Sequence, residues 1–460
     1  MIFPVPLNTN SAVWTTFENA AIQPAPLPSA NPTKSFWLDS DPSANPLAKA
    51  GSTGPLPDAA DVVIIGSGIT GCSAAYHLAN LVKSSGGEIK SVSAALERQA
   101  SNHTLFGAEL HRPRSTRLGR NGGHLTPVSI HDFRDRVKLH GKDEALRDVE
   151  LERYTVSSIL NFLEKTPNAA DEVDLVRGGH VTLLFSPEEV EAARADMSAA
   201  VEAGLDLTGV DWLEPDVTLD RFRVRLPGVF GPGHTIWPLK LVTKLFEDAK
   251  GTKAPDTWIG KASALFSRTA PPAFSLDLFT QAPVDAVGEA PNPKTGRKSA
   301  GERMKDTNIG KFARPPVNEE DRALVVLGGG RETAVPHHEF NVADDSTIHP
   351  VVSATLRGFL PTLFPHDFEA GEPEMEWTGI MGFTRNGNPM VGPVCGDDDQ
   401  VLVGQYIAAG YSGHGMPRAF ACAEIVAQMI YAEMLGKPWT APKWFPCHLL
   451  TRPLADTRGS

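Results

Sequence analysis

The feature that most constrains this chain of 460 residues is a glycine-rich turn between an apolar run and a helical pattern. The segment DVVIIGSGITGCSAAYHLA begins at Asp61 with a run of β-formers and continues into three glycines. A buried strand, a turn of this spacing and a helix N-terminus form the crossover that binds dinucleotides. Gly66 allows the tight turn, Gly68 lets a pyrophosphate approach the backbone, and Gly71 lets the helix pack on the strand. The predicted cofactor residues of this turn are Gly66, Ser67, Gly68, Ile69, Thr70 and Gly71.

A dinucleotide site of this kind also needs an acid at the end of the second strand, to accept the ribose hydroxyls. The run SVSAALE ends at Glu97, 26 residues after Gly71, and the polar loop at 83–90 accounts for a spacing longer than about 20. We predict that Glu97 and the adjacent Arg98 contact the cofactor. A carboxylate at this place would repel a 2′-phosphate, so NAD or FAD is favoured over NADP.

Composition and charge exclude several classes of partner. The chain has 43 Lys and Arg against 55 Asp and Glu, a net charge of −12 without a long basic run, so we expect no nucleic-acid or membrane partner. The first 33 residues contain no Lys or Arg, which argues against a secretory or mitochondrial leader. Four scattered cysteines without a CxxC pair predict neither disulfides nor zinc and fit a reducing compartment. We therefore predict a cytoplasmic protein.

Hydrophobic periodicity predicts helices alternating with strands along most of the chain. Helices are expected over 136–163, 187–203, 236–250, 347–364 and 415–435. Strands are expected over 178–186, 323–331 and 401–410, with a hairpin over 376–394 that turns at Asn386-Gly387. The helix at 187–203 has Ser186 as a cap and Gly204 as its stop signal. The polar stretch 288–322 shows neither period and is interpreted as a flexible insertion or a degraded segment.

A second glycine-rich turn follows the predicted strand at 401–410. The string GYSGHGMPRAF begins at Gly410 and opens a helix, whose N-terminus is a positive pole. A reduced isoalloxazine has negative charge on its N1–C2=O edge, which such a pole would stabilise, whereas a nicotinamide has no comparable need. The alternative is a helix start that packs against the first crossover without a ligand. The predicted cofactor residues here are Gly413, His414, Gly415 and Met416.

A third anchor is the loop LGRNGGHLTP, which begins at Leu118. Its glycines allow close approach to a flat ring, and Arg120 and Asn121 can donate hydrogen bonds to it. His124 ends the loop and is either a residue with a direct chemical role or a structural histidine. The predicted cofactor residues of this loop are Gly119, Arg120, Asn121, Gly122, Gly123 and His124.

These three strings, in this order, resemble FAD-dependent oxidoreductases of the D-amino-acid oxidase / glycine oxidase / sarcosine oxidase (DAO) family. The third string includes WTGIMGFTRNGNPMVGPV, in which Gly382 is a further predicted cofactor residue. The chain looks most like the fungal members, which share the arm NPTKSFWLDS, and the resemblance covers most of residues 30–435. Sarcosine oxidases link their flavin to a cysteine in the segment that here is GIMGFT, so the resemblance implies non-covalent FAD.

The resemblance implies an α/β fold in which a Rossmann-type FAD-binding domain is interleaved with a mixed-sheet α+β substrate domain. The implied segments are the arm at 1–60, the FAD-binding parts at 61–135, 201–287 and 396–436, the mainly substrate-domain parts at 136–200 and 323–395, the insertion or degraded segment at 288–322, and the tail at 437–460.

The resemblance also implies a reaction, in which a hydride passes from the carbon next to an amine nitrogen to flavin N5 and oxygen is the acceptor. The substrate would be a small amine or amino acid; a carboxylate would need an arginine fork, for which Arg385 and Arg418 are the candidates. His124 completes the candidate catalytic residues. No metal site is predicted, since His337, His338 and Glu339 lack HExxH spacing.

Two alternatives stay open at this point. The segments 98–118 and 288–322 depart from the family pattern, which would suit a catalytically impaired or non-catalytic member that lacks part of the cofactor-wrapping region. An NAD-linked dehydrogenase would use the first glycine turn equally well, but it leaves the helix after Gly413 unexplained. The sequence does not give the oligomeric state.

Overall fold

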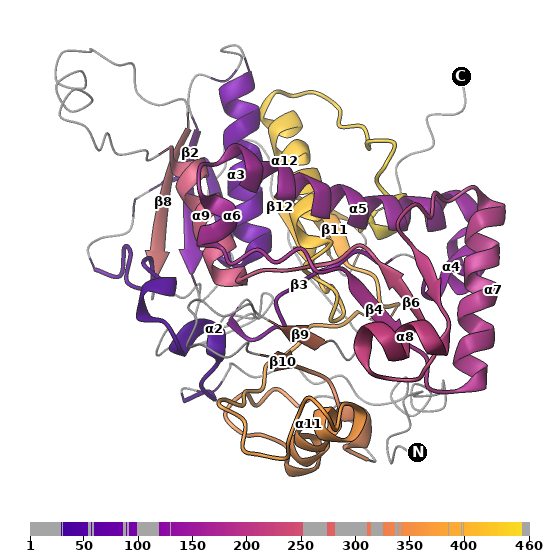
Figure 1. Ribbon diagram of the computed structural model, residues 1–460. Helices are drawn as coiled ribbons and strands as arrows, with labels where there is room; N and C mark the ends of the chain where they lie inside the picture. Colours follow the sequence, from indigo (N-terminus) through magenta and orange to yellow (C-terminus); the bar gives the residue numbers. More distant parts are fainter. Residues whose placement is uncertain are drawn as a thin grey trace.

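We analysed a computed structural model of the chain (Figure 1). The residues it describes are 29, 31–53, 57, 59–85, 89, 92–98, 119–128, 130–251, 274–280, 311–313, 325–335, 339, 342–384, 386–396, 398 and 400–452.

A parallel three-stranded sheet with a crossover helix confirms the first motif. Its elements are β1 (Val62–Ile65), α3 (Ile69–Ser84), β2 (Val92–Arg98) and β8 (Phe274–Thr280). The strand order is β1-β2-β8, and Ile65 is the neighbour of Glu97 in the β1–β2 register. The carboxyl end of β1 therefore lies beside Glu97, where a Rossmann sheet places its ribose-binding acid.

Two helices pack against α3 and form the main core with it (Figure 1). They are α9 (Pro238–Lys250) and α12 (Ala419–Met434), and both were predicted from their apolar spacing. Ala75, Leu78 and Ala79 of α3 are nearly or fully buried. The two alanines are small and let the neighbouring helices approach closely. This packing brings the first and the last predicted glycine turns onto adjacent helices.

A second, antiparallel sheet lies on the other side of the molecule (Figure 1). In it β6 (Gly228–Gly231) pairs with both β4 (His180–Leu183) and β5 (Asp211–Leu213). A division at 200/201 would therefore run through a single sheet, and the sheet pairings assign β5 and β6 to the same unit as β4. Flanking helices are α7 (Pro187–Ala203), with the predicted capping box at Ser186 and a left-handed Gly204, and α8 (Pro215–Phe222).

The helix predicted over 136–163 is interrupted. The structure forms α4 (Phe133–His140) and α5 (Lys142–Lys165), which meet at Gly141. Gly141 has φ +86°, a left-handed conformation that a right-handed helix cannot contain. Hydrophobic spacing alone did not reveal this break because the apolar stripe continues from one helix to the next.

One other prediction was wrong, and the interpretation of the stretch 288–322 stays a prediction. Residues 376–384 form no strand; the antiparallel partner of β11 (Met390–Cys395) is β12 (Val401–Ala409). Within the polar stretch 288–322, β9 (Lys311–Ala313) pairs with β10 (Val325–Leu327). The remaining described elements are η1 (Pro42–Ala44), β3 (His124–Leu125), α6 (Ala169–Glu172), β7 (His234–Thr235), η3 (Arg331–Thr333), α11 (Pro350–Leu363) and η4 (Cys447–Leu449).

The described part of the N-terminal arm contains two short helical turns, α2 (Phe36–Asp39) and η1 (Figure 1). Trp37 is buried against Trp237, with ring centroids 5.4 Å apart and the rings edge to face. The Trp237 indole also donates a hydrogen bond of 3.1 Å to the Trp37 carbonyl. The arm is thus part of the folded core.

Candidate functional site

The turn between β1 and α3 has the geometry of a phosphate cradle. Gly66 adopts φ +99°, and a Cβ added to Gly71 would lie 1.8 Å from the Gly66 carbonyl oxygen, so both positions require glycine. The hydroxyl oxygen of Ser67 is buried and has no hydrogen-bond partner among the described residues. The amides of Ile69 and Thr70 at the start of α3 bond no oxygen of the described residues. A buried hydroxyl and free amides at a helix N-terminus fit a pyrophosphate.

The turn between β12 and α12 forms a second cradle, residues 413–416. Gly413 has φ +84° and the preceding Ser412 has φ +52°, so the chain reverses sharply before the helix. Among the described residues, no oxygen accepts from the amides of Gly413, Gly415 and Met416. This second set of free donors lies just ahead of the α12 N-terminus, which favours an anionic group.

A direct hydrogen bond joins the two cradles. The Thr70 hydroxyl in the first turn of α3 donates to the Tyr411 hydroxyl ahead of α12 over 3.2 Å. Tyr76 of α3 and Phe420 of α12 continue the contact, with ring centroids 5.8 Å apart. The two helix N-termini therefore lie side by side, as a ligand that spans both cradles would need.

The glycines of the loop at 119–124 make room for the arm. A Cβ at Gly119 would lie 2.3 Å from the Leu38 side chain, and one at Gly123 would lie 3.0 Å from the Trp37 ring. The Trp37 indole also donates to the Asn121 carbonyl over 2.5 Å. Gly119 and Gly123 are thus needed for packing of the arm, and the approach of this loop to a flat ring stays a prediction.

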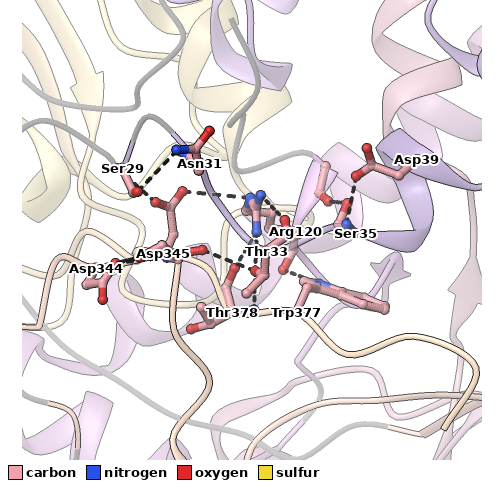
Figure 2. Close-up of polar contacts among 12 residues, drawn as sticks. Ser29, Asn31, Thr33, Ser35, Asp39, Arg120, Asp344, Asp345, Trp377 and Thr378 are labelled. Carbon is pink, nitrogen blue, oxygen red and sulfur yellow. Dashed lines mark hydrogen bonds and ion pairs between the residues drawn. The ribbon is translucent and has the colours of Figure 1, made fainter. Parts of the chain in front are cut away.

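Arg120 is engaged by the arm as well (Figure 2). Its guanidinium donates to the Thr33 hydroxyl over 2.8 Å, to the Thr33 carbonyl, and to the Thr378 carbonyl over 2.7 Å. Its Nε lies 3.8 Å from the Asp345 carboxylate, and both side chains are nearly fully buried. Arg120 therefore joins three distant segments of the chain through its two terminal nitrogens, and its predicted contact with the flavin ring stays a prediction.

The segment 376–384 connects this loop to the second cradle. The Trp377 indole donates to the Arg120 carbonyl over 3.1 Å (Figure 2). At the other end, the Ser412 amide donates to the carbonyl of Gly382 over 3.1 Å, and the Thr384 amide donates to the Ser412 hydroxyl over 3.2 Å. Gly382 thus supports the second cradle through its backbone.

Three histidines from different segments gather where these loops meet. His124 lies on β3, and its ring centroid is 6.5 Å from that of His180 on β4. Burial lowers the pKa of His124 well below its usual range, and nearby His180 and His414 lower it further. Burial and His414 also lower the pKa of His180. His124 is therefore neutral at pH 7.

Arg418 is bound through its Nε to a buried acid. Its Nε donates to Glu152 of α5 over 2.8 Å, and the His414 Nε2 lies 3.0 Å from the other oxygen of the same carboxylate. The role of Arg418 as a fork for a carboxylate substrate stays a prediction. Arg385, the other candidate, lies outside the described residues.

Glu152 is the site residue that sequence reasoning missed. A signal was present: Glu152 lies three residues after Val149 and four before Val156, on the apolar stripe of α5. An acid at a core position of an amphipathic helix must find partners inside the protein. Burial would raise its pKa, but the charges of His414 and Arg418 and hydrogen bonds from His414 and the Val128 amide hold it at about 2.

No helix in the part of the chain that the structure describes combines the length and the apolar character needed to cross a bilayer. In the same residues, no three His, Cys, Asp or Glu side chains are grouped so that they could hold a metal ion.

Comparison with known proteins identifies the family. The sequence profile of the DAO family, described as FAD dependent oxidoreductase, matches residues 61–254 and 286–429, well over half of the chain. No curated protein matches.

Solved structures share the fold at low sequence identity. L-amino acid deaminase from Proteus vulgaris is 16% identical with a TM-score of 0.50 over 86% of this chain and 98% of that chain. The Proteus myxofaciens deaminase, in complex with anthranilate, is 12% identical with a TM-score of 0.50 over 87% and 95%. Glycine oxidase from Bacillus cereus is 14% identical with a TM-score of 0.47 over 82% and 96%. The family match decides for FAD over NAD: this chain belongs to the DAO family of FAD-dependent oxidoreductases.

Proposed function

We propose that this enzyme oxidises the C–N bond of a small amine or amino acid, with oxygen as the electron acceptor. One observation carries the proposal: two helix N-termini with free amides are joined by the hydrogen bond between Thr70 and Tyr411. A dinucleotide with a second anionic edge would use both, whereas a nicotinamide dinucleotide would use one. The family match supports FAD as that dinucleotide.

The chain supplies position and electrostatics to the cofactor. We infer that Ser67 and the amides at Ile69 and Thr70 hold the pyrophosphate, Glu97 accepts the ribose hydroxyls, and residues 413–416 approach the pyrimidine edge. Bound FAD would supply a hydride acceptor at N5, which dioxygen would reoxidise with release of hydrogen peroxide. The imine left on the substrate would hydrolyse in water.

We propose further that the cofactor is held without a covalent bond, because the segment GIMGFT at 379–384 contains no cysteine. Cys422 is an unsuitable nucleophile, since burial raises the pKa of its thiol to about 12. We also propose that the enzyme is cytoplasmic, that it is of the fungal type of the family, and that its substrate is a small molecule. Its FAD-binding and substrate domains would be interleaved along the chain. In that division we move the part that contains β5 and β6 to the substrate domain.

The test is a visible spectrum of the purified protein, followed by anaerobic mixing with a panel of amines and amino acids. We expect flavin absorbance, bleaching with at least one compound, and hydrogen peroxide when air is admitted. A yellow protein that no compound bleaches would contradict the proposal and identify a non-catalytic member. A colourless protein whose melting temperature does not rise with added FAD would identify a scaffold that has lost its cofactor site.

A further inference from the structure

The carboxylate of Glu152 joins two parts of the candidate site. Its side chain is 0% exposed, and its oxygens accept from the Val128 amide at 2.5 Å and from Arg418 at 2.8 Å. The third partner is the His414 Nε2, at 3.0 Å. Val128 follows β3, while His414 belongs to the second cradle and Arg418 lies two residues after it. One buried charge on α5 thus fixes the second cradle relative to the strand that carries His124.

The chemistry of this contact assigns the hydrogen on the His414 ring. Because the Arg418 guanidinium lies 2.8 Å from Glu152, the group is a carboxylate near neutral pH and can only accept hydrogen bonds. The Nε2 of His414 must therefore carry a hydrogen, which leaves Nδ1 as the other functional atom of the ring. The His414 side chain is 31% exposed, so the ring is not sealed from a ligand.

We propose that His414, oriented by Glu152, accepts the proton that the substrate ammonium group must lose before oxidation. This inference rests on the proposed function and assigns a residue to its first step. The N–H bond of the ammonium breaks, the new N–H bond forms at Nδ1 of His414, and the nitrogen keeps the electron pair. The substrate is then the neutral amine, from which a hydride can leave, and Glu152 stabilises the imidazolium that has formed.

The charges around His414 support this assignment. The His414 ring contacts the Glu152 carboxylate of α5. Arg418, the residue before α12, is also close, and the same carboxylate neutralises its charge. From β3 and β4 the ring has His124 and His180, whose pKa values burial lowers. His124 and His180 are thus poor proton acceptors near pH 7.

Asp148 is the other acid of this group. It lies one turn before Glu152 on α5, and burial raises its pKa although His448 and Arg418 oppose this. The Nε2 of His448 lies 3.4 Å from its carboxylate. Asp148 is therefore directed to the C-terminal segment, and we assign it no part in the proton transfer.

The experiment compares His414→Gln and Glu152→Gln with a matched control, Glu144→Gln. Glu144 lies on the same helix and also holds one arginine, one histidine ring and one backbone amide, from Arg147 and His448. It does not contact the second cradle. Each variant is first checked for flavin absorbance and melting temperature, and kcat/KM is then measured from pH 6 to pH 10 with an amine that the wild type oxidises.

For His414→Gln we expect kcat/KM at pH 7 to fall about 100-fold or more, the usual contribution of a positioned base. The activity should recover as the pH approaches that at which the free amine is neutral, which a merely misfolded variant would not show. Glu152→Gln should lose at least about tenfold at pH 7, and Glu144→Gln should match the wild type. A His414→Gln enzyme with wild-type kcat/KM at pH 7, or a loss that is the same at every pH, would overturn the proposal.

A second readout does not need turnover. Nitrogen NMR of histidine-labelled protein distinguishes the two ring nitrogens, and we expect a hydrogen on Nε2 of His414 in the wild type and loss of this preference in Glu152→Gln. A hydrogen on Nδ1 alone would overturn the pairing, and with it the proposal. If no amine is oxidised, the proposed function and the proton-accepting role fall together, and the NMR result still decides the pairing.

Discussion

At the scale of single residues, the first cradle contains a hydroxyl whose environment suits a ligand. Ser67 and Ser73 both have buried hydroxyls without a hydrogen-bond partner, but only Ser67 lies in the glycine turn. An unsatisfied buried polar group costs about 1–3 kcal/mol. We therefore predict that Ser67→Ala and Ser73→Ala both leave the FAD-free protein equally stable or more stable in urea unfolding. Only Ser67→Ala should weaken FAD binding, measured by titration of flavin fluorescence; equal affinities in the two variants would remove Ser67 from the cofactor site.

His77 gives a residue-scale prediction about pH. This residue of α3 packs against α12, with its ring 4.4 Å from that of Phe420. Burial lowers its pKa from 6.5 to about 3. The folded protein thus keeps His77 neutral. The stability that this residue contributes is fully present above pH 6.5 and is lost as the pH falls toward 3. Between pH 6.5 and pH 5 this loss is about 2 kcal/mol.

Replacing His77 should reduce this acid sensitivity. We expect urea unfolding of His77→Gln to show about 2 kcal/mol less destabilisation between pH 6.5 and pH 5 than the wild type, while the exposed His366→Gln behaves as the wild type. Identical pH dependence in the wild type and His77→Gln would show that this histidine is not kept neutral in the fold.

At the scale of elements, the arm holds the loop at 119–124 through buried polar contacts. Thr33 receives hydrogen bonds from Arg120 and from the Thr378 amide, and it donates to the Asp345 carbonyl (Figure 2). Arg120→Ala would leave the buried Asp345 carboxylate without its cation, which typically costs 3–5 kcal/mol. An exposed pair, Arg177 with Glu164, provides the control.

We therefore predict that Arg120→Ala lowers the free energy of unfolding by about 3–5 kcal/mol, whereas Arg177→Ala lowers it by less than about 1 kcal/mol. Urea unfolding followed by tryptophan fluorescence measures both, because Trp37 leaves its contact with Trp237 when the arm is released. Equal small losses would mean that the arm is not held by Arg120.

The sequence predicted elements well where the local signals were sufficient. The helices α7, α9, α11 and α12 follow from apolar spacing and caps, and β12 follows from its apolar run. The hairpin over 376–394 failed because the backbone of 376–384 finds its partners elsewhere, at Thr33 and Ser412. Apolar alternation records which side chains are buried, but it does not identify the distant chain that receives the backbone hydrogen bonds.

At the scale of the whole molecule, the order of the glycine motifs predicted that the two ends of the chain meet, and the contact of Thr70 with Tyr411 shows that they do. The partners of Arg120, Arg418 and Glu152 could not be predicted, because a charged side chain in a single sequence has no signal for which opposite charge it will meet. These long-range pairs decide which predicted site residues stay available to a ligand.

The position of Thr33 also determines when the arm can attach during synthesis of the chain. Its partners at Asp345 and Thr378 emerge from the ribosome more than 300 residues later, which at 5–20 residues per second is a delay of roughly 15 to 70 s. Trp37 meets Trp237 only after 200 residues, so until then its apolar surface is exposed to other proteins, and Thr33 lacks these two partners for the whole delay. Attachment of the arm must therefore be a late step of folding, and chaperones would have the greatest opportunity to bind before it.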